Sequence, residues 1–324
     1  MSTLEKAVNS YLGELEEADA NRLQFFKGLW DVQDSLTEGA APYAVPSGEE
    51  ATEAAKDREP LFARFTPEID RDAYLGAVAR VAEYVGANAG LSDDQAAALA
   101  AADFDGAITD EALAKAPYAV EEFLAEVYEG LLPEDDDAES EEADETILAP
   151  AVFAMVAVAS LTPLVAGAAI DARRAIDNKT LSELSPQECP ICGSPAAMSF
   201  VGERSSLQGG DRKLWCGMCH VTWPYGRLRC ARCGTRSATA LHYKHTEEDP
   251  GHRIHICDEC HGYIRTVFHD EVSHIISPVV EDIVTSHLHV VAEELGYTAA
   301  GDGIKRDVPT GLEYPEDVNL EGSF

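Results

Sequence analysis

The sequence predicts an α+β protein in which an N-terminal all-α domain is followed by two tandem four-cysteine modules and a C-terminal helix. Three observations predict this class. Apolar residues recur at three- and four-residue spacing through most of the first half of the chain. All eight cysteines occur as Cys-x-x-Cys pairs between residues 189 and 260. Helical periodicity then returns over residues 271–297, before an irregular tail at 298–324.

The expected helical domain covers residues 1–185. Amphipathic patterns fill the first 36 residues and then 68–88, 92–103 and 109–132, with N-terminal signals at Thr66-Pro67, Ser92-Asp93 and Thr109-Asp110. The block 134–145 is almost entirely acidic and has no apolar face, which predicts a solvated loop.

The segment 147–170 contains 24 residues and no charge, and it is therefore long enough to span a membrane. Pro150 and Pro163, the high share of alanine and the acidic block on one side favour the other interpretation. We therefore expect a buried helix at the centre of the helical domain and no membrane span.

The charge of the chain excludes several partners. It carries 59 acidic and 24 basic residues, for a net charge of −35. Such a surface repels itself unless salt screens it, which indicates adaptation to a salty cytoplasm, as in halophiles. It also argues against non-specific attraction to nucleic acid or anionic membranes. Residues 186–270, with 10 Lys/Arg and 9 Asp/Glu, form a nearly neutral island.

The cysteines form an internal repeat. Adding 41 to the positions of the first four gives the positions of the last four, which are listed in order as Cys189, Cys192, Cys216, Cys219, Cys230, Cys233, Cys257 and Cys260. Each four-cysteine module, 186–226 and 227–270, therefore has the form C-x2-C-x23-C-x2-C. The repeat predicts consecutive pairing of the Cys-x-x-Cys turns, and interleaved pairing stays open.

Two facing Cys-x-x-Cys turns aim four thiolates at one ion, so each unit predicts one closed metal site. Sulfur-only coordination suits Zn(II) or a rubredoxin-like Fe, and a closed site with no open position argues against direct Lewis-acid catalysis. The intervening segments KLWC, HVTW and HIC suit short strands of a ribbon. The chain opens without a secretory signal, which predicts a reducing cytoplasm and metal ligands rather than disulfides.

Two other uses of these cysteines, haem attachment and dithiol redox chemistry, fit the sequence less well. Cys-x-x-Cys-His, the haem attachment signature, occurs at 216–220 and at 257–261, but attachment would leave half of the cysteines unexplained. Thioredoxin-like dithiol chemistry expects a single motif that opens a helix, which four repeated pairs do not match.

A basic and aromatic cluster lies around the boundary between the two four-cysteine modules. A zinc ribbon with such a cluster could contact nucleic acid or an acidic peptide, or its arginines could serve packing and internal ion pairs. The cluster consists of Trp223, Tyr225, Arg227, Arg229, Arg232 and Arg236.

The segments CPICGSPA, LWCGMCHVTWPYGRLRCARCG and ICDECHGYIRTV resemble the FdhE family of formate dehydrogenase accessory proteins. That family has four Cys-x-x-Cys pairs in this order, with further positions matched here by Trp223, Arg227, Tyr263 and Arg265. The resemblance covers roughly 147–300. His220 and His261 are not part of the family pattern and inherit no role.

The resemblance implies a non-catalytic, cytoplasmic maturation factor that binds the catalytic subunit of formate dehydrogenase, a molybdenum or tungsten enzyme, or a related molybdoenzyme. It also implies rubredoxin-like iron in the cysteine sites. A rubredoxin-like electron carrier and a zinc-ribbon nucleic-acid binder are the alternatives. We expect two metal ions, Fe or Zn, a homodimer as a further assembly, and partner contacts at Trp223, Arg227, Arg229, Tyr263 and Arg265.

Overall fold

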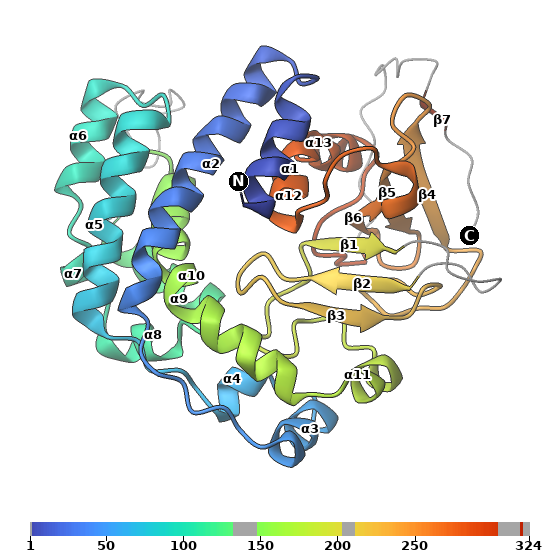
Figure 1. Ribbon diagram of the computed structural model, residues 1–324, viewed down its shortest axis with the longest axis horizontal. Coiled ribbons are helices and arrows are strands. Elements are labelled where there is room, and N and C mark those ends of the chain that lie inside the picture. Colours follow the sequence, from blue (N-terminus) through green and yellow to red (C-terminus); the bar gives the residue numbers. More distant parts are fainter. Residues whose placement is uncertain (1, 132–147, 203–210, 304–317, 320–324) are drawn as a thin grey trace. The chain divides into compact units, whose positions relative to one another are not determined.

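The computed structural model describes residues 2–131, 148–202, 211–303 and 318–319 (Figure 1). The acidic block 134–145 lies outside these residues. The chain divides into two compact units. A helical unit comprises Gln24–Ala175 and Ile191–Ser194, and a sheet unit comprises Met1–Leu23, Ile176–Pro190 and Pro195–Phe324.

The expected N-terminal helix is two helices, α1 (Thr3–Leu12) and α2 (Glu17–Leu36), because the chain turns at the C-cap residue Gly13. From Gln24 onward, α2 belongs to the helical unit. The other helices of that unit are α3 (Gly48–Lys56), α4 (Leu61–Arg64), α5 (Arg71–Asn88), α6 (Asp93–Ala101), α7 (Phe104–Ala107), α8 (Asp110–Lys115), α9 (Val120–Leu131) and α10 (Pro150–Ala175).

Local capping explains where several of these helices begin. Ser92 caps α6 in a capping box with Gln95, and Thr109 caps α8, both as predicted. Helix α5 begins later than the Thr66-Pro67 signal suggested, because the Asp70 carboxylate accepts a hydrogen bond from Ala73 N–H at 2.8 Å. A single side-chain cap thus moves the helix start by several residues.

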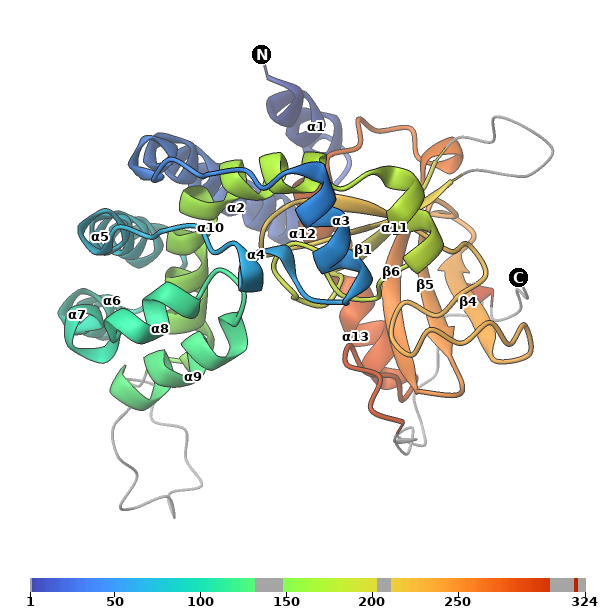
Figure 2. The same cartoon turned by 90° about the horizontal axis from the view of Figure 1, so that it is seen from below.

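Helix α10 is the core helix of the helical unit, as its apolar sequence predicted. It packs against α3, α5 and α9 (Figure 2). It is long and apolar enough to cross a membrane, but 67% of its most apolar window is buried in the protein. This burial is typical of the central helix of a folded domain.

Pro163 lies inside α10 and lacks the N–H that would bond the carbonyl of Ala159. The Gln33 side chain of α2 donates to that carbonyl at 2.8 Å. The helix therefore continues through a proline because a neighbouring helix supplies the missing donor.

The sheet unit contains one sheet with the strand order β3-β2-β1-β6-β5-β4-β7. Its strands are β1 (Met198–Val201), β2 (Arg212–Trp215), β3 (Thr222–Tyr225), β4 (Leu241–Thr246), β5 (His252–Cys257), β6 (Gly262–Phe268) and β7 (Val318–Asn319). The segments KLWC, HVTW and HIC lie at β2, β3 and β5, as predicted.

Each cysteine module contributes three antiparallel strands, β1–β3 and β4–β6. The two modules join where β1 pairs with β6 in parallel, with Met198 opposite Arg265. The first strand of one module thus lies beside the last strand of the other. The tandem ribbons are therefore halves of a single sheet.

Two short helices, α12 (Pro278–Val284) and α13 (His287–Glu294), replace the single helix expected over 271–297. At the break, the carbonyl of Asp282 accepts a hydrogen bond from the Arg265 side chain at 2.6 Å. The N–H of Ser286, which would bond that carbonyl in a continuous helix, donates to the carbonyl of Ile283 at 3.1 Å. Helix α13 covers one face of the sheet, where Leu288 and Ala292 pack on Ile254, Ile256 and Tyr263. Helix α11 (Asn178–Leu184) packs beside β3.

Candidate metal centres

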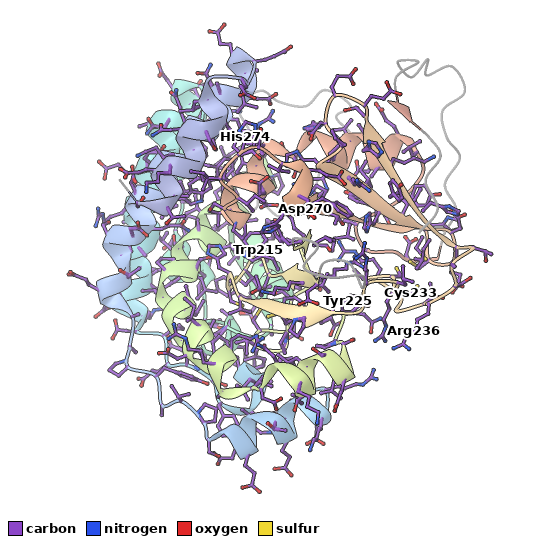
Figure 3. All side chains as sticks on the ribbon, turned by 45° about the vertical axis from the view of Figure 1, so that its right-hand side comes forward. Trp215, Tyr225, Cys233, Arg236, Asp270 and His274 are labelled. Carbon is purple, nitrogen blue, oxygen red and sulfur yellow. The ribbon has the colours of Figure 1, made fainter. Side chains whose placement is uncertain are left out.

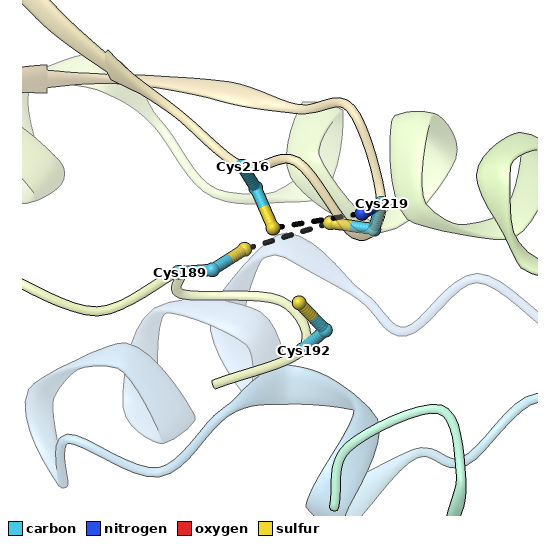
Figure 4. A group of neighbouring side chains, drawn as sticks. All are labelled: Cys189, Cys192, Cys216 and Cys219. Carbon is cyan, nitrogen blue, oxygen red and sulfur yellow. Dashed lines mark hydrogen bonds between the residues drawn. The ribbon is translucent and has the colours of Figure 1, made fainter. Parts of the chain in front are cut away.

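The first candidate centre brings together Cys189, Cys192, Cys216 and Cys219. Their sulfur atoms all lie within 4.8 Å of one another, and all four residues are buried. Figure 4 shows the four sulfurs pointing toward one another, with Cys189 Sγ and Cys219 Sγ at 3.6 Å. Both Cys-x-x-Cys turns of the first module therefore face one point.

The second candidate centre, built from Cys230, Cys233, Cys257 and Cys260, has the same form. Its sulfurs approach at 3.7 Å between Cys230 and Cys260 and at 3.8 Å between Cys233 and Cys257. Cys233 is exposed, whereas the other three are buried. Figure 3 shows Cys233 near Arg236 at the edge of the sheet unit. The consecutive pairing that the repeat predicted is the one observed.

The turns that present these sulfurs share one backbone design. Cys216 N–H donates to Val221 at 3.0 Å, and the equivalent bond from Cys230 to Thr235 is 2.9 Å. The residue after each pair has a positive φ: Gly193 (80°), His220 (61°), Gly234 (76°) and His261 (49°). Glycine adopts this left-handed conformation without cost, and histidine is among the side chains that tolerate it.

The histidines of Cys-x-x-Cys-His therefore occupy the left-handed position of the turn that glycine occupies after the other two pairs. The His220 ring stacks on Trp215 at 5.5 Å between centroids, and the His261 ring lies 6.1 Å from that of Tyr297. The cysteines of both motifs belong to four-sulfur groups. This arrangement favours a metal site over haem attachment at both motifs.

The donor set fits the metals that the spacing indicated. Four convergent thiolates suit Zn(II) or a single Fe, and none of the eight cysteines, all of which lie in the described ranges, forms a disulfide. A hydrogen bond from Cys260 lowers the pKa of Cys230 to about 5, against the opposing effect of burial. Burial raises the pKa of Cys257 to about 12. A metal ion must therefore displace protons from this cluster when it binds.

Three arginines lie on one cavity beside the second centre. Arg212, Arg229 and Arg232 line the same small cavity as Cys230 and Cys257. Arg212 is buried, and burial lowers its pKa to about 10. It donates to Ser199 Oγ at 2.7 Å and to the carbonyl of Arg229 at 2.8 Å.

Our sequence reasoning did not single out Arg212. The 41-residue repeat offered a signal, because it relates Arg212 to Arg253, so that each module carries an arginine four residues before the first cysteine of its second pair.

Of the five residues expected to contact a partner, three are buried inside the sheet unit. Trp223, Tyr263 and Arg265 are at most 3% exposed. Trp223 Nε1 donates to the carbonyl of Pro186 at 2.8 Å, and Arg265 Nη1 donates to Thr285 Oγ1 at 3.0 Å. These three side chains make internal contacts, and their role toward a partner stays a prediction.

The segment 223–229, here called the joint, connects the two modules. Arg227 and Arg229 are half-buried in it. Arg229 donates to the carbonyls of Ser185 and Gly234 and lies over the Tyr225 ring at 5.6 Å. Between them, Leu228 is 54% exposed. Sequence reasoning did not single out Leu228, although it is the apolar side chain that this joint presents to solvent.

Comparison with known proteins finds similar sequences and a similar fold. No family model matches the chain. An FdhE homolog of Stutzerimonas stutzeri is 34% identical over 122 residues, which cover 36% of this chain and 39% of that protein. An FdhE homolog of Aquifex aeolicus is 31% identical over 109 residues. The FdhE protein of Escherichia coli is 30% identical over 112 residues, or 35% of its length.

The crystal structure of the FdhE protein from Pseudomonas aeruginosa covers 93% of both chains with a TM-score of 0.57 and 20% identity. At that identity the match concerns the fold. The sequence matches span about a third of this chain and less than two-fifths of each curated relative. By sequence over that third, and by fold over nearly all of its length, this chain resembles the FdhE proteins.

Proposed function

We propose that this chain is a formate dehydrogenase accessory protein of the FdhE type. It acts in the cytoplasm, binds two metal ions, and supports assembly or activation of the enzyme through its catalytic subunit, without catalysing a reaction itself. The observation that carries the proposal is the pair of four-cysteine groups within a fold shared with an FdhE protein. The curated relatives named FdhE support the same assignment.

In this proposal the metal ions act as structural anchors. Cys189, Cys192, Cys216 and Cys219 would hold one ion, and Cys230, Cys233, Cys257 and Cys260 the other. A bound Zn(II) or Fe supplies folding free energy at such a site, and iron would add one-electron chemistry. The protein's own contribution is to aim the sulfurs and to hold the joint between the modules rigid.

The joint is the proposed docking surface. Its Trp223 and Arg229 side chains donate hydrogen bonds to backbone carbonyls and so hold it in place; the acceptors are Pro186, Ser185 and Gly234. Arg227 and the exposed Leu228 would then contact the partner, while Tyr263 and Arg265 would support the sheet from within β6. Arginine is enriched at protein interfaces, and the buried centre of an interface is more apolar than the rest of the surface.

A pull-down with the catalytic subunit of formate dehydrogenase tests the proposal. We expect the metal-loaded chain to retain that subunit in a high-salt buffer, which screens the repulsion that a net charge of −35 causes. Leu228→Glu should abolish retention. Val290→Glu is the matched control, because Val290 is 57% exposed on α13 of the same unit. Absence of retention by the unmodified, metal-loaded chain contradicts the proposal.

A rubredoxin-like electron carrier is the second candidate, because Cys233 exposes one side of the second centre. This function requires iron and a reversible colour change on reduction. Metal analysis with an absorption spectrum decides between the two: colourless protein that holds two zinc ions eliminates the carrier.

A further inference from the structure

The charges of Arg212, Arg229 and Arg232 have no carboxylate counterpart in the described part of the chain. Ion pairs between arginine and carboxylate there are formed by other arginines, among them Arg22, Arg64, Arg71, Arg174, Arg253 and Arg265. A buried or half-buried guanidinium is costly unless an anion lies nearby. Three such groups on one cavity therefore indicate an anion at that place.

Neutral backbone carbonyls orient these three arginines. Arg229 donates to Gly234 at 3.0 Å, and Arg232 donates to Tyr263 at 3.0 Å and to Ala196 at 2.9 Å. Arg212 donates to the carbonyl of Arg229 at 2.8 Å. Carbonyls hold the guanidinium groups in place but do not cancel their charge.

The anion with the right position is the second four-cysteine centre. Cys230 and Cys257 line the same cavity as the three arginines, and Arg232 N–H donates to Cys230 Sγ at 3.3 Å. Four thiolates around a divalent ion carry a net charge of about −2, which the three guanidinium groups are suited to balance.

We propose that Arg212, Arg229 and Arg232 are the built-in counter-charge of the metal–thiolate complex at Cys230, Cys233, Cys257 and Cys260, and that they increase its affinity for metal. The three arginines act through the charge of the complex and are not ligands. This inference rests on metal binding by the second centre and is independent of the formate dehydrogenase partner.

The test is a Co(II) titration of the metal-free full chain, in which sulfur-to-cobalt absorption reports each four-sulfur site. The unmodified chain should fill two sites. If it fills none, metal binding itself is refuted, and that failure is distinct from a failure of the present inference. Arg229→Gln and Arg232→Gln should each weaken one site about 10- to 100-fold, as loss of an outer-shell partner typically does.

Charge and shape are separated by matched variants. Arg229→Lys and Arg232→Lys keep the charge but change the hydrogen bonds, so they should recover most of the affinity. Arg236→Gln, at an exposed arginine beside the same centre, is the control and should bind as the unmodified chain does. Arg212→Gln is the harsher variant, because Arg212 also holds loop carbonyls.

The affected site is identified in a Cys230→Ser/Cys260→Ser background, where the remaining first site should bind Co(II) equally well with or without Arg232→Gln. Three results would overturn the inference: unchanged affinity in the Gln variants, an equal loss with Lys and Gln, or weakening of the first site in that background. If Arg212→Gln does not fold, the Arg229 and Arg232 variants still decide the question.

Discussion

At the scale of single residues, the sheet unit holds a buried polar cluster apart from the metal centres. His252 Nδ1 lies 2.7 Å from Asp249 and its Nε2 lies 2.9 Å from Glu281, while Tyr11 donates to Glu281 at 2.9 Å. Glu281 is fully buried. The cluster ties α1 to β5 and α12, and no spacing rule in the sequence brings these four residues together.

This cluster predicts a pH dependence of stability. Burial alone would lower the pKa of His252, but its bonds to Asp249 and Glu281 raise it to about 9. Because the folded value exceeds the ordinary 6.5, the stabilisation is complete below about pH 6.5 and is lost as pH rises through 9. The loss should amount to about 3 kcal/mol.

Urea unfolding of the metal-loaded chain between pH 6 and pH 10 measures this slope. His252→Asn should remove it. His242→Asn is the control, since His242 pairs with Asp258 at the surface. A slope that survives in His252→Asn would assign the pH dependence to other groups.

The left-handed residues after the cysteine pairs carry a second prediction. Gly234→Ala should cost about 1–2 kcal/mol, because φ is 76° and the new Cβ would lie 3.0 Å from Gln187 Nε2. His261→Gly, at the equivalent turn position, should fold and keep its metal. Thermal unfolding and metal content measure both effects. Gly13→Ala, where nothing lies within 4 Å, is the control, and an equal cost there would contradict the argument.

At the scale of elements, α10 depends on a donor from α2. Removing the amide in Gln33→Ala leaves the Ala159 carbonyl unpaired, which should cost about 1–3 kcal/mol. In a Pro163→Ala background, the restored N–H can bond that carbonyl, so the same change should cost less. Denaturant unfolding of the four variants of this double-mutant cycle gives the coupling. Equal costs of Gln33→Ala in both backgrounds would show that the proline is irrelevant.

The strands show how far local pattern reaches. The short apolar segments at β2, β3 and β5 were predictable because strand residues and knuckle glycines are local signals. The parallel pairing of β1 with β6 was not predictable, since it joins Met198 to Arg265 across most of both modules. Long-range pairing depends on how the faces of the strands pack, which composition does not reveal.

At the scale of the whole molecule, removal of metal is predicted to affect the two units differently. The sheet unit carries seven of the eight cysteines, all except Cys192, and metal–thiolate bonds supply a large part of the folding free energy of such modules. After chelation, amide hydrogens of β1 and β6 should exchange rapidly, while those of α5 and α10 keep their protection. Hydrogen exchange before and after chelation measures this. Unchanged protection in β1 and β6 would mean that the sheet folds without metal.

The sequence by itself determined the features that local spacing encodes: the helical first half, a core helix expected over 147–170 and observed as Pro150–Ala175, and two consecutive four-cysteine sites. A Cys-x-x-Cys turn needs only a few neighbouring residues to aim two sulfurs, so its spacing is sufficient information. Tertiary structure decided what depends on distant segments. It joined the modules into one sheet, placed α1 in the sheet unit, buried Trp223 and Tyr263, and brought Arg212, Arg229 and Arg232 to one cavity beside the second centre. The physical reason is that side-chain burial and charge balance are set by residues far apart in the chain.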